Sequence, residues 1–382
     1  MKFQVSSKEF SRVANAVSKV ISKKNTISIL ADILLSKEGE CYYLTGSSTE
    51  NSLSMRIGVV PDMYDTEFSP VCIPTQTIKD ALATLSEQPI EVTIDGKTLT
   101  IEHSSGVFQM GVNDASTYPT IGNISESVTA FNVDSKVFIN AVKDASASTK
   151  DDPLHVVFGC VCVDLRSLSD GAANCISIVG TDAQTLYCYD YAKDNGSFAD
   201  NGAKILIHSS LINALSDSFA NVGDIHIAFD GNHAILSANG ISFVVTSPEG
   251  RYPDYRRVFP SESLYSVTLN TKEMASAIKR VSLMASNTQM VRLQFEGENV
   301  TLSADDADFA KRATDRVGLV SSNIEEGFAV GLKCTNVTKV LDSIKTDNVV
   351  LNITAPNRPI VFCEDNDNSC LRELVMPMTL ND

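Results

Sequence analysis

The feature that most constrains this chain is an eight-residue motif that occurs three times. It reads F-x-V-x-S-K-x-F from Phe3 and again from Phe131, an offset of 128 residues. A looser copy, V-x-L-x-T-K-x-M, begins at Val267, at an offset of 264 from the first. Similarity that returns at a nearly constant spacing indicates a repeated structural unit. The sequence therefore predicts three copies of one domain.

Landmarks elsewhere in the chain repeat at similar offsets. The tripeptide that begins at Leu44 returns in related form at Ile178 and Leu302, at offsets of 134 and 258. Tyr118-Pro119 returns as Tyr252-Pro253, again at 134. Each copy then has roughly 125 residues, a common domain size. The predicted domains are 1–123, 128–257 and 262–382, joined by short polar links near 122–130 and 256–264.

Each copy is expected to begin with a strand followed by a helix. In the first copy, Ser6 or Ser7 can cap a helix that runs to about Ile21. Alternating apolar residues around Asp95-Gly96 and Asp230-Gly231 predict two hairpins with tight turns. A second amphipathic helix in each copy presents one apolar stripe to a sheet. The predicted fold is therefore α+β, and three repeated surfaces side by side favour an arch or a ring.

The charge is unevenly distributed along the chain. The formal net charge is −16, which by itself argues against a nucleic-acid partner. The six predicted helices nevertheless contain 15 basic and 8 acidic residues, against 16 and 39 in the rest of the chain. Those helical windows are 7–24, 74–87, 134–150, 208–221, 271–287 and 333–346. The helices are thus positive and the remainder strongly negative, although window 208–221 contains Asp217 and no lysine or arginine.

The basic residues also share one face of the first helix in each copy. At about 100° per residue, Lys8, Arg12, Lys19 and Lys23 point away from the apolar side. Lys136, Lys143 and Lys150 form a similar stripe in the second copy, and Lys272, Lys279 and Arg280 repeat it less tightly in the third. An amphipathic helix ordinarily has a charged outer face, which is the simpler interpretation of one helix. The same sign in three copies of an acidic chain favours a binding face for a polyanion that is contacted through its phosphates.

Other protein classes find little support in the sequence. No apolar run is long enough to span a membrane, and the N-terminus MKFQVSSKEF lacks the apolar core of a signal peptide. The nine cysteines form no C-x-x-C pair, which fits a reduced cytoplasmic protein, and Cys160 and Cys162 are interpreted as two buried thiols on one strand. The five histidines are scattered, and no hydrolase, P-loop or dinucleotide motif occurs. We therefore predict no enzymatic activity, no cofactor and no metal site.

Three stretches resemble the bacterial DNA polymerase III beta subunit family, the replicative sliding clamps. They are the opening MKFQV with TISIL from Thr26, the run GRYPDYRRV from Gly250, and the ending VMPMTL from Val375. The resemblance extends over the whole chain, including its length and its triplication.

The resemblance implies a head-to-tail homodimer in which six clamp domains close a ring, with helices inside and sheets outside. Such a ring encircles double-stranded DNA without reading its sequence and tethers the replicative polymerase and other DNA-processing proteins. A clamp loader opens it, and it would be cytoplasmic and associated with the nucleoid. The basic residues implied to contact DNA are Lys8, Arg12, Lys19, Lys23, Lys24, Lys136, Lys143, Lys272, Lys279 and Arg280. The family positions at the dimer interface are Phe108 and Met110 on one side and Leu283 and Met284 on the other.

The resemblance also implies a groove that binds short client peptides with a Gln-x-x-Leu-Phe-like motif. Its residues are Val157, Thr181, Leu186, Pro253, Arg257, Val258, Leu374, Met376, Pro377, Met378 and Leu380. Alternatively, Met376 and Met378 simply cover the last strand. The chain departs from the family at Ala183-Gln184-Thr185, where many members have Gly-His-Arg, and in the added Asn381-Asp382. Gln76 also replaces a basic position.

The main alternative function is a non-catalytic scaffold of three domains that does not encircle DNA. Such a scaffold would keep the repeats but would not require the basic stripes. An enzyme is the competitor from another class, and Asp305-Asp306 with Asp308 is the cluster that suggests a metal. That cluster lacks the spacing and glycine of an EF-hand, and we interpret it as an acidic edge for pairing with a neighbouring subunit.

Overall fold

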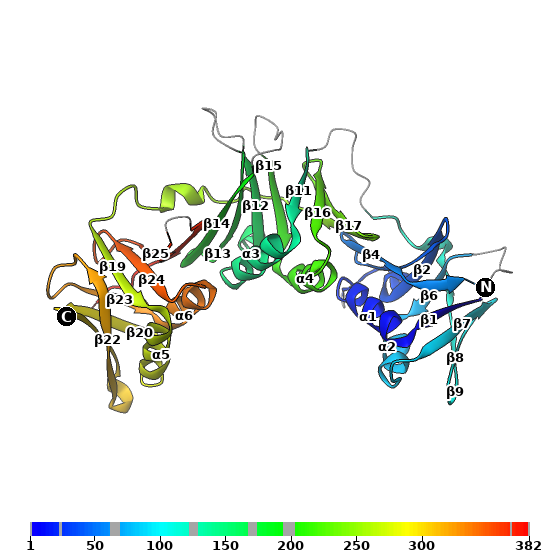
Figure 1. Ribbon diagram of the computed structural model, residues 1–382, viewed down its shortest axis with the longest axis horizontal. Helices are drawn as coiled ribbons and strands as arrows, with labels where there is room; N and C mark the ends of the chain where they lie inside the picture. The colour runs from blue at the N-terminus through cyan, green and yellow to red at the C-terminus, as the bar shows by residue number, and fades with distance from the viewer. Residues whose placement is uncertain are drawn as a thin grey trace. The chain divides into compact units, whose positions relative to one another are not determined.

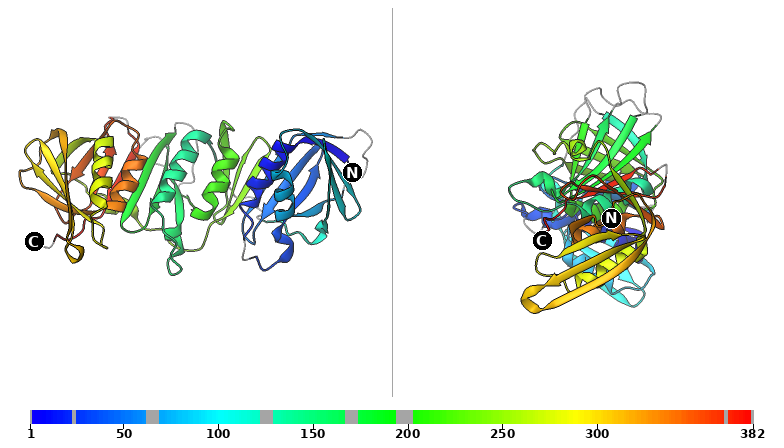
Figure 2. Two further views of the ribbon diagram at one scale, coloured as in Figure 1. Left: turned by 90° about the horizontal axis from the view of Figure 1, so that it is seen from below. Right: turned by 90° about the vertical axis from the view of Figure 1, so that its left-hand side faces the viewer.

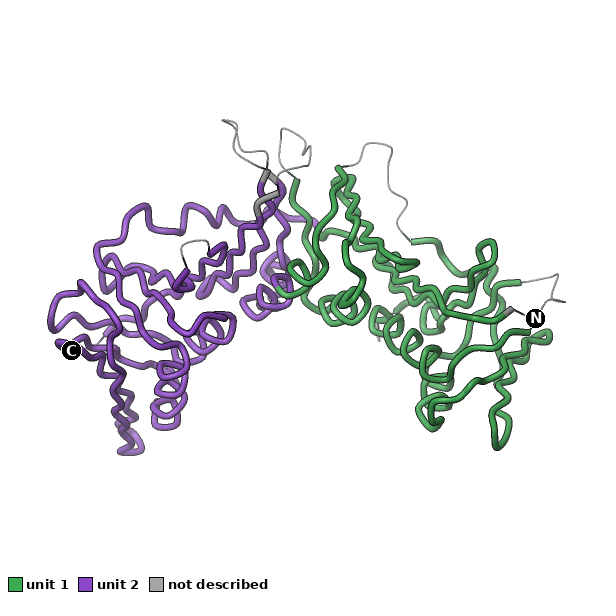
Figure 3. The backbone as a smooth tube through the Cα atoms, in the orientation of Figure 1, with its two compact units in different colours: residues 1–140, 197–199, 203–248 green, residues 141–196, 200–202, 249–382 purple. Residues whose placement is uncertain are grey.

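The structure is a computed structural model that describes residues 2–22, 25–61, 69–121, 129–166, 174–193, 203–366 and 369–380. They belong to two compact units (Figure 3). Unit 1 contains Met1–Asn140 and Ala203–Pro248, unit 2 contains Ala141–Gly196 and Glu249–Asp382, and residues 197–202 are divided between them. The division falls within a helix, so the predicted boundaries at 123/128 and 257/262 remain predictions, and 122–128 lies outside the described residues.

Unit 1 contains two antiparallel sheets and the helices that cover them (Figure 1). The five-stranded sheet has the order β5-β1-β7-β8-β9 and the nine-stranded sheet the order β10-β6-β2-β3-β4-β18-β17-β16-β11. The strands are β1 (Lys2–Ser6), β2 (Asp32–Glu38), β3 (Cys41–Ser47), β4 (Ser52–Ile57), β5 (Val59–Pro61), β6 (Val71–Pro74), β7 (Pro89–Asp95), β8 (Thr98–His103), β9 (Gly106–Gly111), β10 (Asn113–Asp114), β11 (Thr129–Asp134), β16 (Asp224–Phe229), β17 (His233–Ala238) and β18 (Ile241–Thr246), with β15 (Ala203–His208) in the same unit. The helices are α1 (Ser7–Ser18), α2 (Thr75–Ala83), α4 (Ile212–Phe219) and the first residues of α3 (Ser135–Ala147). The predicted hairpins at Asp95-Gly96 and Asp230-Gly231 are confirmed as β7–β8 and β16–β17.

Unit 2 is organised around one continuous antiparallel sheet. Its strands follow the order β12-β13-β14-β26-β25-β24-β19-β22-β21-β20-β23. They are β12 (Cys160–Arg166), β13 (Asn174–Thr181), β14 (Thr185–Lys193), β19 (Tyr265–Asn270), β20 (Met290–Glu296), β21 (Asn299–Asp306), β22 (Lys311–Ser322), β23 (Ala329–Lys333), β24 (Asn348–Ile353), β25 (Ile360–Glu364) and β26 (Leu371–Val375). The helices are α5 (Thr271–Ser282), α6 (Cys334–Ser343) and the rest of α3. The pairing of β14 with β26 joins the second and third predicted repeats in one sheet.

Two helices lie side by side in the first repeat and in the third. Helix α1 packs against α2 in unit 1, and α5 packs against α6 in unit 2 (Figure 2). Their apolar faces are buried, as Phe10 and Val13 in α1 and Met274 and Ile278 in α5 illustrate, each no more than 1% exposed. Their cationic residues therefore remain on the outer faces.

The serine or threonine of the repeated motif makes the same pair of contacts in all three copies. Ser7 donates its hydroxyl to the Ser86 carbonyl at 2.8 Å, and Thr271 donates to the Thr346 carbonyl at 3.0 Å. Ser135 donates likewise to the carbonyl of Phe219. The backbone N–H of each of these residues also donates to a second carbonyl. That carbonyl lies one or more residues further along the segment that follows the second helix. The motif thus ties the two helices of a repeat together, and this explains why a small hydroxyl residue recurs there.

A second structural feature is shared by the first two repeats. The hydroxyl of Tyr118 donates to the Thr45 carbonyl at 3.5 Å, and that of Tyr252 donates to Val179 at 3.3 Å. The glycine that follows each acceptor lies against the end of the first helix. A Cβ on Gly46 would lie 2.1 Å from the Val17 oxygen, and one on Gly180 would lie 2.0 Å from that of Ala145. The glycine that the first two repeats share at this position is therefore explained by the close approach of a strand to a helix.

Two details of the first helix differ from the prediction. Helix α1 ends at Ser18, about a turn earlier than Ile21, and Lys19 lies at its C-cap. Ser6 is the N-cap residue but its side chain makes no capping hydrogen bond, and the hydroxyl of Ser7 is engaged by Ser86. Ser6 therefore occupies the predicted cap position without a side-chain cap, and Ser7 cannot supply one because a tertiary contact takes its hydroxyl.

Candidate nucleic-acid face and partner groove

The cations of helix α1 are paired with carboxylates. The ammonium of Lys8 lies 3.4 Å from Glu87, and the guanidinium of Arg12 donates two 2.9 Å hydrogen bonds to Glu9. Lys19 forms an ion pair with Asp217 of α4. The predicted DNA-contacting residues Lys23 and Lys24 lie outside the described residues. The first repeat thus presents cations whose charge is already balanced locally.

The lysines of helices α3 and α5 have a different environment. Lys136, Lys143, Lys272 and Lys279 are exposed, and none forms an ion pair with a residue that the structure describes. Arg280 is the exception, because its guanidinium pairs with Asp315 of β22. The hydrogen bond from Arg280 lowers the pKa of Asp315, so this carboxylate stays charged at neutral pH. The second and third repeats therefore present four lysines that are available to an anion.

The predicted groove residues fall into two groups by exposure. Thr181, Leu186 and Leu374 are buried, and Leu186 lies opposite Leu374 in the β14–β26 pair. Val258 and Met376 are 41% and 38% exposed. The first group thus supports the surface from below, and the second group can contact a partner directly.

The C-terminal segment after β26 is held at two points. The Met376 N–H donates to the Gln184 carbonyl at 2.9 Å, and the Met378 N–H donates to the Gly331 carbonyl at 2.8 Å. A Cβ on Gly331 would lie 2.9 Å from Cδ2 of Leu380, so that leucine packs directly on β23. Met378, Pro377 and Leu380 are half-buried. The segment is therefore fixed in place, while Met376 keeps an accessible side chain.

The remaining groove residues belong to the YPDYRRV run and to the segment before β12. The Arg257 side chain is 87% exposed and pairs with Asp254 at 2.8 Å. Pro253 and Val157 are half-buried, and a Cβ on Gly250 would lie 2.7 Å from Val157. The glycine at 250 therefore permits this run to approach Val157.

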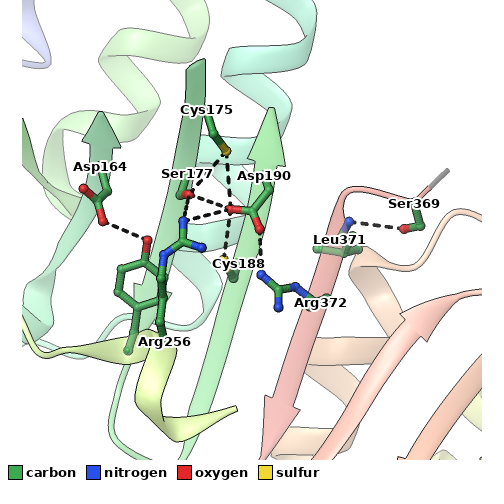
Figure 4. Close-up of polar contacts among 10 residues, drawn as sticks. Asp164, Cys175, Ser177, Cys188, Asp190, Arg256, Ser369, Leu371 and Arg372 are labelled. Atoms are coloured by element: carbon green, nitrogen blue, oxygen red, sulfur yellow. Dashed lines mark hydrogen bonds and ion pairs between the residues drawn. The ribbon is translucent and has the colours of Figure 1, made fainter. Parts of the chain in front are cut away.

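A cluster of charges that the sequence did not predict lies at the β14–β26 junction (Figure 4). Asp190 of β14 accepts from Arg372 of β26 at 2.6 Å and from Ser177 at 2.5 Å, and Arg256 lies 3.5 Å away. Burial would raise the pKa of Asp190, but the Ser177 hydrogen bond and the two arginines outweigh it and lower that pKa. Three distant segments thus meet at one carboxylate. The adjacent arginines of YPDYRRV are the only signal in the sequence for it.

Glu373, on the same strand, is a buried carboxyl of a different kind. It is 1% exposed and is hydrogen bonded to the Ser343 hydroxyl of α6. The same hydroxyl also lies within donating distance of the Val340 carbonyl, at 2.7 Å. Burial raises the pKa of Glu373 well above its usual value, Asp144 raises it further, and Lys345 opposes both. Glu373 is therefore a buried carboxyl whose pKa is raised by its position at the junction.

The four predicted dimer residues also differ in exposure. Leu283 and Met284, at the end of α5, are 73% and 38% exposed. Phe108 is half-buried against His103, with ring centroids 4.9 Å apart, and Met110 is buried. Both lie on β9, the last strand of its sheet. The edge of such a strand has backbone groups that can pair with another chain.

The structure also bears on the excluded classes. Cys160 and Cys162 are buried on β12, as predicted, and burial raises the pKa of Cys160 to about 12. Among the described residues, no three His, Cys, Asp or Glu side chains are grouped so that they could hold a metal ion. Asp305 and Asp306 lie opposite Arg312 and Lys311 in the β21–β22 pair. In the same part of the chain, no helix is both long and apolar enough to cross a membrane.

Comparisons with known proteins agree over the whole chain. Residues 1–122 match the DNA polymerase III beta subunit N-terminal domain, and residues 256–379 match its C-terminal domain. The beta sliding clamp of Helicobacter pylori is 22% identical, with both chains covered completely. The beta subunit structures from Streptococcus pyogenes and Thermotoga maritima align over 100% of both chains, with TM-scores of 0.89 and 0.87 and identities of 18% and 21%. The fold is thus that of three tandem clamp domains.

Proposed function

Because the chain belongs to the DNA polymerase III beta subunit family, we propose that it is a DNA sliding clamp, which encircles duplex DNA and tethers the replicative polymerase. The observation that carries the proposal is the recurrence of Lys8, Lys136 and Lys272 at one position of the repeated motif. All three are exposed, at the start of the first helix of each repeat. Lysines contact phosphates without reading bases, as a protein that slides along DNA requires.

The test of this part is the binding of short linear duplexes. Affinity should be weak, independent of base sequence and lower at high salt, because each phosphate contact releases counterions. Tight binding to one sequence would contradict the proposal. The scaffold alternative predicts no duplex binding at any salt concentration.

We propose that the ring is a homodimer in which β9 and the end of α5 of two chains meet. The exposed Leu283 and Met284 support this, because large apolar side chains with this exposure often mark an interface. The two contacting surfaces differ, so two copies close into a ring only if both contacts form at once. Leu283→Asp with Met284→Asp should give monomers in light scattering. Leu264→Asp, which changes another exposed leucine (62% exposed), should leave the dimer mass unchanged.

We propose that clients bind beside Met376 through a short apolar motif. Exposed Met376 and Val258 supply a flexible and a branched apolar contact, and methionine adapts to varied partners. Deleting residues 376–382 should abolish binding of a Gln-x-x-Leu-Phe peptide, since loss of a central apolar anchor typically costs ~2 kcal/mol or more. The dimer mass should not change. Full affinity in the truncated protein would place the groove elsewhere, and unfolding would favour the alternative in which these methionines only cover the last strand.

We propose that the protein catalyses no reaction of its own and acts with a clamp loader at the nucleoid. Binding of several client classes at one groove would let a single ring serve different DNA-processing proteins in turn. Competition between two unrelated client peptides for one site tests this directly. Simultaneous binding of both peptides to one chain would contradict it.

A further inference from the structure

The turn between β13 and β14 depends on one carboxylate. Asp182 accepts hydrogen bonds from the N–H groups of Gln184 and Thr185, at 3.0 and 2.7 Å, and from the Thr185 hydroxyl at 2.9 Å. Between them, Ala183 has a φ of +67°, a left-handed conformation that is unfavourable for alanine because of its Cβ. A residue under such strain keeps its conformation only where its surroundings hold it. Asp182 provides that hold at the two residues that follow, while the Thr181 hydroxyl accepts from the Ala183 N–H at 3.2 Å.

The second oxygen of the same carboxylate contacts helix α6. Lys339 places its ammonium 3.3 Å from Asp182, and the two side chains are 35% and 10% exposed. A carboxylate this deeply buried requires a compensating charge, and Lys339 supplies it. Asn336, one turn earlier on α6, adds a 3.4 Å hydrogen bond to the Gln184 side chain. Helix α6 therefore holds the turn through two adjacent side chains.

The other side of the turn holds the C-terminal segment. The Gln184 carbonyl accepts from the N–H of Met376 at 2.9 Å, directly after the last β14–β26 pair, Thr185 with Val375. Met378 is held independently, by Gly331 of β23. A shift of the turn would consequently move Met376 and leave Met378 in place.

We propose that Lys339 and Asp182 are positioning residues for the partner groove. Neither touches the client peptide. The Lys339 ammonium fixes the Asp182 carboxylate, the carboxylate fixes the left-handed turn, and the turn fixes the backbone that presents Met376. This inference rests on the proposed client groove, because it assigns to the groove a support that lies on a helix outside it.

The test uses the full-length protein with its methionine methyl groups labelled with ¹³C, and a fluorescent Gln-x-x-Leu-Phe peptide as the probe. Lys339→Gln should weaken peptide binding about three- to tenfold, the size expected for the loss of one ordinary hydrogen bond. It should also shift the Met376 methyl signal and leave that of Met378 unchanged. Lys339→Arg, which can still reach Asp182 with a positive charge, should restore both readouts. Lys345→Gln is the matched control, because Lys345 follows the same helix and pairs with Asp144 at 3.7 Å, away from the turn.

Each outcome decides the proposal. Wild-type affinity together with an unmoved Met376 signal in Lys339→Gln would overturn it. Equal losses in Lys339→Arg and Lys339→Gln, with a lower melting temperature than Lys345→Gln, would make the pair a structural contact only and would also overturn it. If the wild-type protein binds no peptide, the proposed groove fails, whereas the Met376 shift still shows whether the pair positions that residue.

Discussion

The ion pairs on helix α1 and the charged cluster at the β14–β26 junction contain the same chemical groups in different surroundings. Lys8 and Glu87 are 73% and 67% exposed, whereas the Asp190 side chain is 23% exposed and holds two arginines. Water and salt screen the exposed pairs, which typically contribute 0 to about 1 kcal/mol. Breaking a buried pair is far more costly because it leaves a charge without a partner. The cations of the exposed pairs can therefore exchange their carboxylates for phosphates. The Asp190 cluster instead holds the second and third repeats in one sheet.

The largest effect expected from this comparison is on stability. Asp190→Ala leaves Arg256 and Arg372 without their carboxylate and should lower the free energy of unfolding by about 3 kcal/mol. Asp254→Ala, which removes the exposed partner of Arg257, should change it by about 0.5 kcal/mol or less. Urea denaturation of both variants makes the measurement. Equal effects would mean that burial does not distinguish the two pairs.

The second prediction compares the lysines of α3 and α5, which form no ion pair with a described residue, with the ion-paired cations of the first repeat. Replacing Lys136, Lys143, Lys272 and Lys279 by Gln should lower the salt dependence of duplex binding by roughly 3 to 4 in slope, about 0.9 per lost contact. Replacing Lys8, Arg12 and Lys19 should lower it by less per residue, because these cations must first leave Glu87, Glu9 and Asp217. Fluorescence anisotropy at several salt concentrations measures both slopes. A larger loss per residue for the α1 set would reverse our assignment of the DNA face.

The third prediction concerns the buried carboxyl of Glu373 at the junction. The pKa of Glu373 is raised in the folded protein, so the folded state binds its proton more tightly than the unfolded chain. Stability should therefore fall as pH rises from the ordinary glutamate pKa towards the raised one. A glutamine side chain cannot titrate, so Glu373→Gln should stabilise the protein at pH 8, and the gain should disappear near pH 4. A gain that does not vary with pH would show that Glu373 is not the titrating group.

The smallest effect on stability is expected from removing the carboxylates that pair with Lys19 and Arg280. Asp217→Asn with Asp315→Asn should change the free energy of unfolding by about 1 kcal/mol or less for each pair, because Lys19 and Arg280 are well exposed. It should nevertheless raise duplex affinity severalfold, because Lys19 and Arg280 lose their competing partners. Asp95→Asn with Glu298→Gln alters the net charge equally at exposed hairpin turns. If this control raises affinity as much, the gain reflects net charge and not the freed cations.

The parts of the fold that follow a local pattern could be predicted from the sequence. The strand and helix that open each repeat follow from the spaced apolar residues, and the hairpins follow from Asp95-Gly96 and Asp230-Gly231. The loss of Ser7 as a capping residue could not be predicted, because the partner of its hydroxyl, Ser86, is distant in the chain. A helical pattern shows which cations share a face but does not show which carboxylates approach from elsewhere.

The same limit applies to the candidate site. The exposed lysines of α3 and α5 were identified by sign and spacing alone, but Asp217 and Asp315 balance Lys19 and Arg280 from other elements. The Asp190 cluster requires three segments that meet only in the folded chain. Resemblance to a family names positions in the groove, yet only the structure separates the exposed Met376 from the buried Leu186.

The central claim is that the protein holds DNA by encircling it, and retention on DNA of different topology tests it most directly. The protein is loaded with its clamp loader and ATP onto a nicked circular plasmid, separated from free protein by gel filtration at high salt, and then exposed to a restriction enzyme that linearises the plasmid. We expect the protein to remain on the circle and to leave after linearisation, because the ends release a ring that direct contacts alone hold weakly. Equal retention on circular and linear DNA, or none on either, would contradict it.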